Sequence, residues 1–256
     1  MTEAWILTPQ YFEQPEPALS AVVPAGAAVN GPHAIKDRSP DSMARLHRPI
    51  AEFVEAAAKR GDRPVSIAGD CCGSIPVLAG MIAAGVTPAF VWIDAHGDFN
   101  TPETSPSQFL GGMPLAMMVG RGPQDMCRAV GLTPVREDRI WAIDLRDLDP
   151  LEREAIDASA LRRTGMAGFE TLKVAGPVYV HIDMDVVDAT EVGAFNYPVP
   201  GGPSVAQTVK ACRSFAASNR VAAVSISGWT GALDTDGSAA RATGQVLKAI
   251  LGGAPA

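Results

Sequence analysis

Two short acidic stretches have the residue types and spacing to bind metal ions. In "DAHGD", Asp94, His96 and Asp98 occupy every second position after an apolar run, and in "DMD", Asp183 and Asp185 follow another. Side chains at positions i, i+2 and i+4 of an extended chain point to the same side, so each set can converge on one point. Gathered together, these groups would repel one another strongly without a cation. The two stretches therefore predict a divalent metal site, with two ions expected.

The chemistry expected of such a site is hydrolysis. A carboxylate-rich ligand set with an imidazole suits Mn²⁺ or a similar borderline ion better than structural zinc. Two ions roughly 3.5–4 Å apart, bridged by carboxylates, can make a nucleophile from water at neutral pH. We therefore expect two Mn²⁺ ions per chain.

The elements that must position these groups alternate between strands and helices. Apolar runs predict strands at residues 4–8, 64–68, 89–94, 139–144, 177–182 and 221–227, as expected for strands covered on both faces. Helical patterns predict helices at 41–60, 74–84, 113–119, 123–130, 151–163, 204–218 and 238–251. This alternation predicts a single α/β domain over residues 1–256, with a mainly parallel sheet and helices on both faces. Residues 95–112 form a long connection, and such loops are usually functional.

Polar residues follow several of the predicted strands. In open parallel sheets, ligands bind at the carboxyl ends of the strands. The groups there are Asp70, Cys71 and Cys72; Asp94, His96 and Asp98; Asp144, Asp147 and Asp149; and Asp183, Asp185 and Asp188. Four strand ends thus bring acids or thiols toward one edge of the sheet.

Composition excludes several classes of partner. The chain has 256 residues, 47% of them hydrophobic, a net charge of −7 and no long basic block, so neither nucleic acid nor a membrane surface is an expected partner. The N-terminus has no basic region, and no apolar run reaches the ~18 residues of a membrane span, so we expect a cytoplasmic protein. Adjacent Cys71 and Cys72 suit reduced thiols better than a disulfide framework. The oligomeric state is left open.

The sequence resembles the arginase–agmatinase (ureohydrolase) family from about Val65 to Asp234. The resemblance rests on "GDCCGS", "IDAHGDFNTPETSPS", "LRDLDPLE" and "HIDMDVVDA". It implies a three-layer α/β/α sandwich, a dinuclear manganese cluster and hydrolysis of a guanidinium or amidinium C–N bond. It also implies ligand roles: Asp94 and Asp183 bridge both ions, Asp98 completes one, and His96 and Asp185 bind the other, with His96 and Asp98 also the candidate catalytic residues.

One metal ligand departs from the family pattern. The family's remaining ligand is a histidine in "GGDH", and here "AGDC" places Cys71 at that position, with Cys72 as the alternative. A thiolate can bind Mn²⁺ but also favours Zn²⁺ or Fe²⁺. The other interpretation is that Cys71 is a small buried residue and the site has one ligand fewer.

Two further departures concern catalysis. Arginases carry a histidine, thought to shuttle protons, in "LHG", and here "LGG" has Gly111. Arginases also carry a glutamate that pairs with the guanidinium, whereas "SISGWTGALD" has no carboxylate before Asp234. His33, His47 or His181 could replace the lost shuttle, although His181 also fits a packed position within the sheet.

The resemblance also extends to the amino-acid end of a substrate. Asn100, Ser105 and Ser107 fall on positions that hold an α-carboxylate in arginases. Asp149 falls on the position that holds the α-amino group, with Glu152 as a helper. These matches favour a guanidino α-amino acid over agmatine.

The leading hypothesis is a hydrolase of arginine or a modified arginine. The cysteine-containing branch of the family is similar to the Nω-hydroxy-L-arginine hydrolase of cycloserine biosynthesis, an antibiotic pathway, which implies release of hydroxyurea and L-ornithine. An N-hydroxyguanidine is less basic than arginine, and its hydroxyl could approach the metals or fill the space opened at Gly111. The alternatives are another guanidino or amidino compound, or a binding or partner subunit with little turnover.

Replacing Asp94 or Asp183 with alanine is expected to remove both ions, because the resemblance gives each carboxylate a bridging position. Elemental analysis of the purified variants measures this directly. Full metal content in both variants would contradict the ligand assignment.

Overall fold

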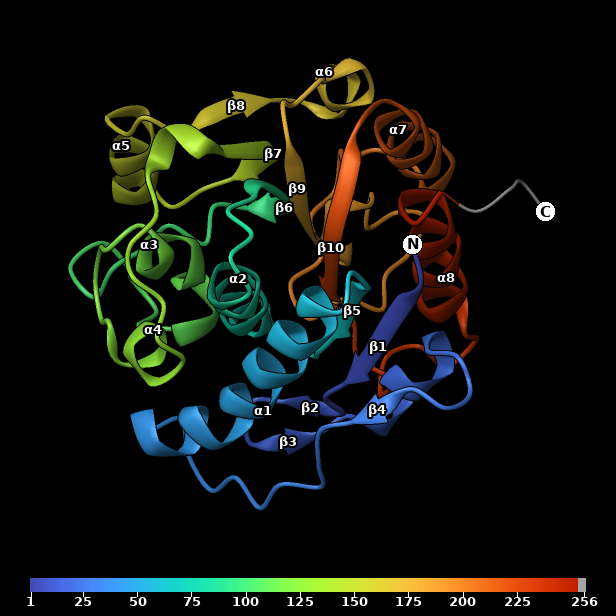
Figure 1. The fold of residues 1–256 in the computed structure, drawn as a ribbon. Helices are drawn as coiled ribbons and strands as arrows, with labels where there is room; N and C mark the ends of the chain where they lie inside the picture. Colours follow the sequence, from blue (N-terminus) through green and yellow to red (C-terminus); the bar gives the residue numbers. More distant parts are fainter. Residues whose placement is uncertain (253–256) are drawn as a thin grey trace.

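Eight parallel strands form the central sheet of the computed structural model, which describes residues 1–252 (Figure 1). Across the sheet they are β4 (Ala28–Val29), β1 (Glu3–Leu7), β5 (Arg63–Ile67), β10 (Arg220–Ser227), β9 (Pro177–Asp183), β6 (Ala89–His96), β7 (Ile140–Asp147) and β8 (Arg162–Thr164). Every neighbouring pair is parallel. The carboxyl ends of all the strands therefore lie along one edge.

Helices cover both faces of this sheet (Figure 1). One layer contains α1 (Pro40–Lys59), α2 (Ser74–Ala83), α3 (Pro114–Met118), α4 (Asp125–Ala129) and α5 (Pro150–Asp157). The other contains α6 (Met166–Thr171), α7 (Val205–Ser218) and α8 (Ser238–Ile250). None of the helices within residues 1–252 is at once long enough and apolar enough to span a bilayer.

Strand β6 shows why the central strands are near-continuous apolar runs. Phe90 and Trp92 pack into the α1–α5 layer, whereas Val91 and Ile93 pack into the α6–α8 layer. Because both faces are covered, successive side chains are all buried, whichever way they point. Polar residues begin only near the end of the strand, where it leaves the two layers.

Side-chain caps fix where the major helices begin. Ser39 accepts a hydrogen bond from the Ser42 backbone at the start of α1, and Pro40 occupies the first turn, where its missing N–H costs nothing. Ser204 and Gln207 form a reciprocal capping box at the start of α7. Each capping residue lies at the junction of a loop and a helix, so it fixes the residue at which the helix begins.

The predicted α/β sandwich is confirmed, and all six predicted strands are present. The helix predicted over 151–163 is wrong in its second half, because α5 ends at Asp157 and residues 162–164 pair with β7 as edge strand β8. The short strand β4, helix α6 and the hairpin of β2 (Gln10–Tyr11) and β3 (Gln14–Pro15) were not predicted. Elements of two to six residues are too short to display a hydrophobic period.

Candidate metal centre and active site

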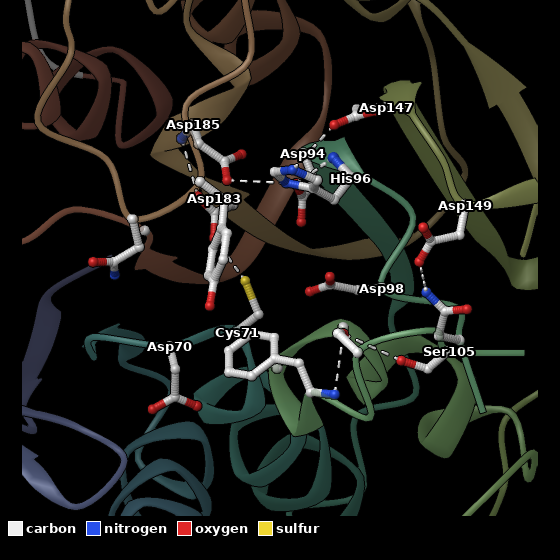
Figure 2. Close-up of a pocket in the computed structure, with 18 of the residues that line it drawn as sticks. Asp70, Cys71, Asp94, His96, Asp98, Ser105, Asp147, Asp149, Asp183 and Asp185 are labelled. Carbon is white, nitrogen blue, oxygen red and sulfur yellow. Dashed lines mark hydrogen bonds and ion pairs between the residues drawn. The ribbon is translucent and has the colours of Figure 1, made fainter. Parts of the chain in front are cut away.

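The carboxyl ends of β5, β6 and β9 deliver the metal-type side chains to one cavity (Figure 2). Asp94 lies within β6 and His96 ends it. Asp183 ends β9, and Asp185 follows in the short 3-10 helix η5 (Met184–Val186). Cys71 begins another, η2 (Cys71–Gly73), directly after β5. Segments far apart in the sequence thus meet because their strands are neighbours in a parallel sheet.

Two trios of potential ligands share one carboxylate. The ligand atoms of Cys71, Asp94 and Asp183 all lie within 4.8 Å of one another, and so do those of Asp94, His96 and Asp185. Cys71 Sγ lies 2.7 Å from Asp183 Oδ2, and His96 Nδ1 lies 3.0 Å from Asp185 Oδ2. Two adjacent trios with a common member are the arrangement that a pair of bridged ions requires.

Asp98 reaches the same cavity by a different route from the one predicted. Strand β6 ends at His96, and Asp98 has a left-handed backbone with φ +46°, so strand alternation does not direct its side chain. Its backbone carbonyl accepts hydrogen bonds from Leu115 and Ala116 at the start of α3. Its carboxylate points toward Cys71 and Asp94 (Figure 2) and has no hydrogen-bond partner within residues 1–252. A buried carboxylate without a donor is the group most in need of a cation.

The electrostatics of the site reflect this crowding. Burial raises the pKa of Asp94 to about 6 and that of Asp183 and Asp185 to about 7, and each carboxyl also feels a neighbouring one. Burial, followed by Asp94, raises the pKa of Asp98 well above its ordinary value. Burial alone lowers the pKa of His96, but Asp185 and Asp94 together raise it to about 12. The mixed oxygen, nitrogen and sulfur donors, crowded and short of partners, fit a pair of divalent ions.

The cavity, of about 220 Å³, also contains the residues predicted to hold an amino acid. Asn100 and Asp149 line it and contact each other, with Asn100 Nδ2 donating to Asp149 Oδ2 at 3.0 Å. Ser105 and Ser107 line it too, and their hydroxyls accept hydrogen bonds from the backbone of Gln108 and Phe109. The hydroxyls therefore shape the loop and still face the cavity.

Glu152 holds this loop in place. One carboxylate oxygen accepts from the Phe99 backbone at 2.8 Å, and the other accepts from the Asp149 backbone at 3.3 Å. The second bond belongs to a capping box at the start of α5. Burial raises the pKa of Glu152 to about 7. Both oxygens already serve the backbone, so the structure favours a positioning role over direct substrate contact.

Gly111, where the family has its histidine, and Gly228, which lies in the stretch without a carboxylate, are both closed by neighbours. A Cβ built on Gly111 would lie 2.3 Å from the Phe109 ring, so the space expected to be open there is filled by Phe109. A Cβ on Gly228 would lie 1.8 Å from Asp183 Oδ1, and Gly228 also has φ +101°. Neither position can take a side chain without moving its neighbour.

Several cavity residues were not singled out from the sequence. They are Tyr11, Phe109, Asn196 and Tyr197, and Asp70 was noted only as a strand-end acid. Phe109 and Tyr197 pack with ring centroids 5.3 Å apart, and the Tyr197 ring lies 6.3 Å from that of His96. Asp147 was noted only as a strand-end acid, and its Oδ2 lies 3.8 Å from His96 Nε2. The aromatic residues come from loops and a short hairpin, where no spacing rule applies.

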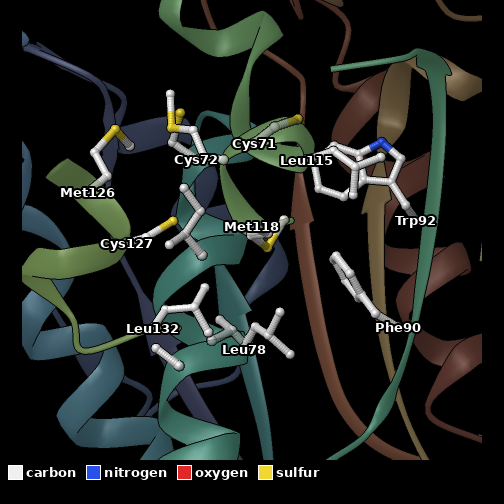
Figure 3. Close-up of a cluster of buried hydrophobic side chains, with 14 of the residues drawn as sticks. Cys71, Cys72, Leu78, Phe90, Trp92, Leu115, Met118, Met126, Cys127 and Leu132 are labelled. Carbon is white, nitrogen blue, oxygen red and sulfur yellow. The ribbon is translucent and has the colours of Figure 1, made fainter. Parts of the chain in front are cut away.

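Other candidate groups lie elsewhere. Cys71 lines the cavity and Cys72 does not. Cys72 faces Leu110 within a buried apolar cluster that also contains Cys127 (Figure 3). All four cysteines are free.

None of the candidate shuttle histidines reaches the cavity. His181 is buried in the core, where burial lowers its pKa to about 3, and neither it nor His33 or His47 lines the cavity. The replacement of the proton shuttle by one of these histidines is therefore not supported. Asp144, which pairs with Arg146, and Asp188 also lie outside the cavity lining.

Comparison with known proteins agrees with this geometry. The Arginase family model matches residues 22–252, so the chain belongs to the arginase family. It is 27% identical over 214 residues to an arginase of Schizosaccharomyces pombe, covering 77% of this chain and 66% of that one. It is 33% identical over 188 residues to the N(omega)-hydroxy-L-arginine amidinohydrolase of Streptomyces lavendulae, covering 69% and 65%. The chain thus spans slightly less than two thirds of the length of these relatives.

Solved structures agree on the fold. The arginase of Bacillus caldovelox superimposes with a TM-score of 0.86 at 21% identity, covering 100% of this chain and 99% of that one.

The metal-free protein is expected to lose stability as pH rises from about 4 to about 7. The pKa values of Asp183 and Asp185 rise from 3.8 to about 7 on folding, so their contribution is complete below 3.8 and is lost through about 7. His96 is protonated in both states over most of this window and does not oppose the trend. Urea unfolding of chelator-treated protein measures the effect, and Asp185→Asn is expected to flatten the pH profile. An identical profile in Asp185→Asn would contradict this expectation.

Replacing Glu152 with alanine is expected to destabilise the protein by about 2–4 kcal/mol. The change leaves the buried Phe99 N–H without an acceptor and removes one half of a helix cap. Denaturant unfolding tests this, with Glu154→Ala as the matched control, because Glu154 is exposed on the same helix. Equal stability of the two variants would show that Glu152 does not anchor the loop.

Proposed function

We propose that the protein is a dinuclear-metal hydrolase that cleaves the guanidino C–N bond of arginine or a modified arginine. The best candidate substrate is Nω-hydroxy-L-arginine, which with one water gives hydroxyurea and L-ornithine. One observation carries the proposal: a single cavity contains both trios of metal-type ligands and the residues suited to hold an amino acid. Family membership supports the reaction class.

The ligand set would hold two divalent ions, with Mn²⁺ expected. Asp94 and Asp183 would serve both ions, and the remaining ligands would be Cys71 and Asp98 on one ion and His96 and Asp185 on the other. When bound, the ions supply the Lewis acidity that activates water for attack at neutral pH.

The chain's own groups would handle protons and orientation around that water. The Asp98 carboxylate, which has no donor within residues 1–252, can accept a proton at Oδ1 or Oδ2. The His96 ring is held between Asp94 and Asp185 at Nδ1, and its Nε2 faces Asp147. An outer group such as Asp147 fixes the orientation of a ligand imidazole.

At the other side of the cavity, the residues suit an α-amino acid. The Asp149 carboxylate, fixed by Asn100, can pair with an ammonium group. The hydroxyls of Ser105 and Ser107 can donate to a carboxylate. A substrate held at this end would direct its guanidino group toward the metal-type ligands.

The groups missing from the cavity favour a weakly basic guanidine. Arginine stays protonated at any working pH, and Gly228, the residue of the cavity lining that follows β10, offers its guanidinium no carboxylate. An N-hydroxyguanidine is far less basic and can bind in the neutral form, beside the rings of Phe109 and Tyr197. The likeness to the Streptomyces lavendulae amidinohydrolase supports the same substrate.

Steady-state kinetics on three compounds test the proposal. We expect kcat/KM to fall in the order Nω-hydroxy-L-arginine, L-arginine, agmatine. A preference for agmatine would contradict the amino-acid site. Absence of turnover with metal bound would favour the alternative of a binding or partner subunit.

Replacing Asp149 with asparagine is expected to lower kcat/KM by about 10- to 100-fold, since a charged hydrogen bond is worth roughly 1.5–3 kcal/mol. Asparagine still caps α5, so stability and metal content should not change. Kinetics with Nω-hydroxy-L-arginine and elemental analysis separate the two effects. An unchanged kcat/KM would show that Asp149 does not bind the α-amino group.

A further inference from the structure

Directly behind Cys71, a serine links the cavity to the core. Ser227 Oγ lies 3.2 Å from Cys71 Sγ and 3.2 Å from Asp183 Oδ2. On its other side, Ser227 Oγ lies 3.5 Å from His181 Nε2. Ser227 is 1% exposed, so no solvent reaches its hydroxyl to satisfy it.

The link continues deeper between β9 and β10. His181 Nδ1 lies 2.7 Å from Ser225 Oγ, and Ser225 Oγ lies 2.6 Å from the Tyr179 hydroxyl. Register pairs Ser225 with His181 and Ser227 with Asp183, so the groups alternate along neighbouring strands on one face of the sheet. The His181 ring also packs against Trp92, with centroids 4.3 Å apart.

Serine, histidine and tyrosine side chains are unusual between two buried strands. Polar side chains buried among apolar ones cost free energy unless they are fully hydrogen-bonded. Ser66, at the same level on the neighbouring strand β5, has a buried hydroxyl with no partner within residues 1–252, so a serine here is not automatically part of a network. By contrast, the side chains of Tyr179, Ser225, His181 and Ser227 form an unbroken series of hydrogen bonds, and this series ends at the Cys71 sulfur.

The donors of this chain can all point toward the sulfur. The Tyr179 hydroxyl lies 3.2 Å from the Ser74 backbone carbonyl and 2.6 Å from Ser225 Oγ, and in this arrangement its proton goes to the nearer Ser225. Ser225 then donates to His181 Nδ1, and His181 Nε2–H donates to Ser227. The Ser227 hydroxyl proton is then left for Cys71 or Asp183. A sulfur that has given up its proton to bind a metal is an acceptor only, which is what this end of the chain requires.

We propose that Ser227, oriented by His181, donates a hydrogen bond to the Cys71 sulfur and positions it as a metal ligand. The inference rests on the metal site of the proposed function. A donated hydrogen bond draws charge from the sulfur, so the thiolate becomes a weaker donor, closer to the imidazole that it replaces. Outer hydrogen bonds of this kind change metal affinity by about 10- to 100-fold.

Co²⁺ is a direct probe, because a cobalt–thiolate bond gives a charge-transfer band in the near ultraviolet. The metal-free protein is titrated with Co²⁺, and Cys71→Ala should lack the band. Ser227→Ala should shift the band to lower energy, because the sulfur then holds its electrons less tightly. It should also bind Co²⁺ about 10- to 100-fold more weakly, because the loss of the group that positions the sulfur outweighs the stronger donation of the free thiolate. Ser227→Thr keeps the hydroxyl and should restore both properties.

Ser66→Ala is the matched control, since it removes a buried hydroxyl of the same row that contacts neither Cys71 nor His181. It should bind Co²⁺ and absorb like the wild-type protein. If Ser227→Ala matches the wild type, or if Ser66→Ala changes as much as Ser227→Ala, the role of Ser227 is refuted while the metal site stands. If the wild-type protein shows no band that depends on Cys71, the ligand assignment itself is refuted.

Discussion

Repulsion among buried acids is the constraint on which this structure depends. Asp94, Asp98, Asp183 and Asp185 are all nearly inaccessible to solvent and share one cavity. Each resists ionisation chiefly because it is buried, and further because its neighbours would carry the same charge. The topology of a parallel sheet places them together, because the carboxyl ends of its strands lie at one edge. Protonation relieves the repulsion at low pH, and the ions of the proposed function would relieve it at neutral pH.

The loop between β6 and α3 turns this charge cluster into a cavity with two ends. Asp98 and Asn100 stand at its beginning, and Phe109 and Gly111 near its close. Its start is tied to α5 through Glu152, which bonds the Phe99 backbone. The same helix has Asp149 at its cap, so the acid that we propose for the amino group of a substrate is bonded to Asn100 of the loop that we propose for its carboxylate. The distance between the two ends of the cavity is therefore set by rigid elements.

Much of this site could be predicted from the sequence, because its signals are local. Asp94 and His96 follow an apolar run, and the position of Cys71 follows from the short stretch after β5. What escaped prediction depends on contacts between distant segments. The aromatic neighbours Phe109 and Tyr197 come from loops without periodicity. Asp98 was predicted correctly to face the cavity, but for a reason that its left-handed backbone overturns.

The pairing of Phe109 with Gly111 also bears on how such a site can evolve. A side chain at position 111 would collide with the Phe109 ring as that ring now stands. A residue with a side chain at position 111 would therefore require the Phe109 ring to leave its present place against Tyr197. The two positions are thus coupled, because the residue at one of them decides which residues fit at the other.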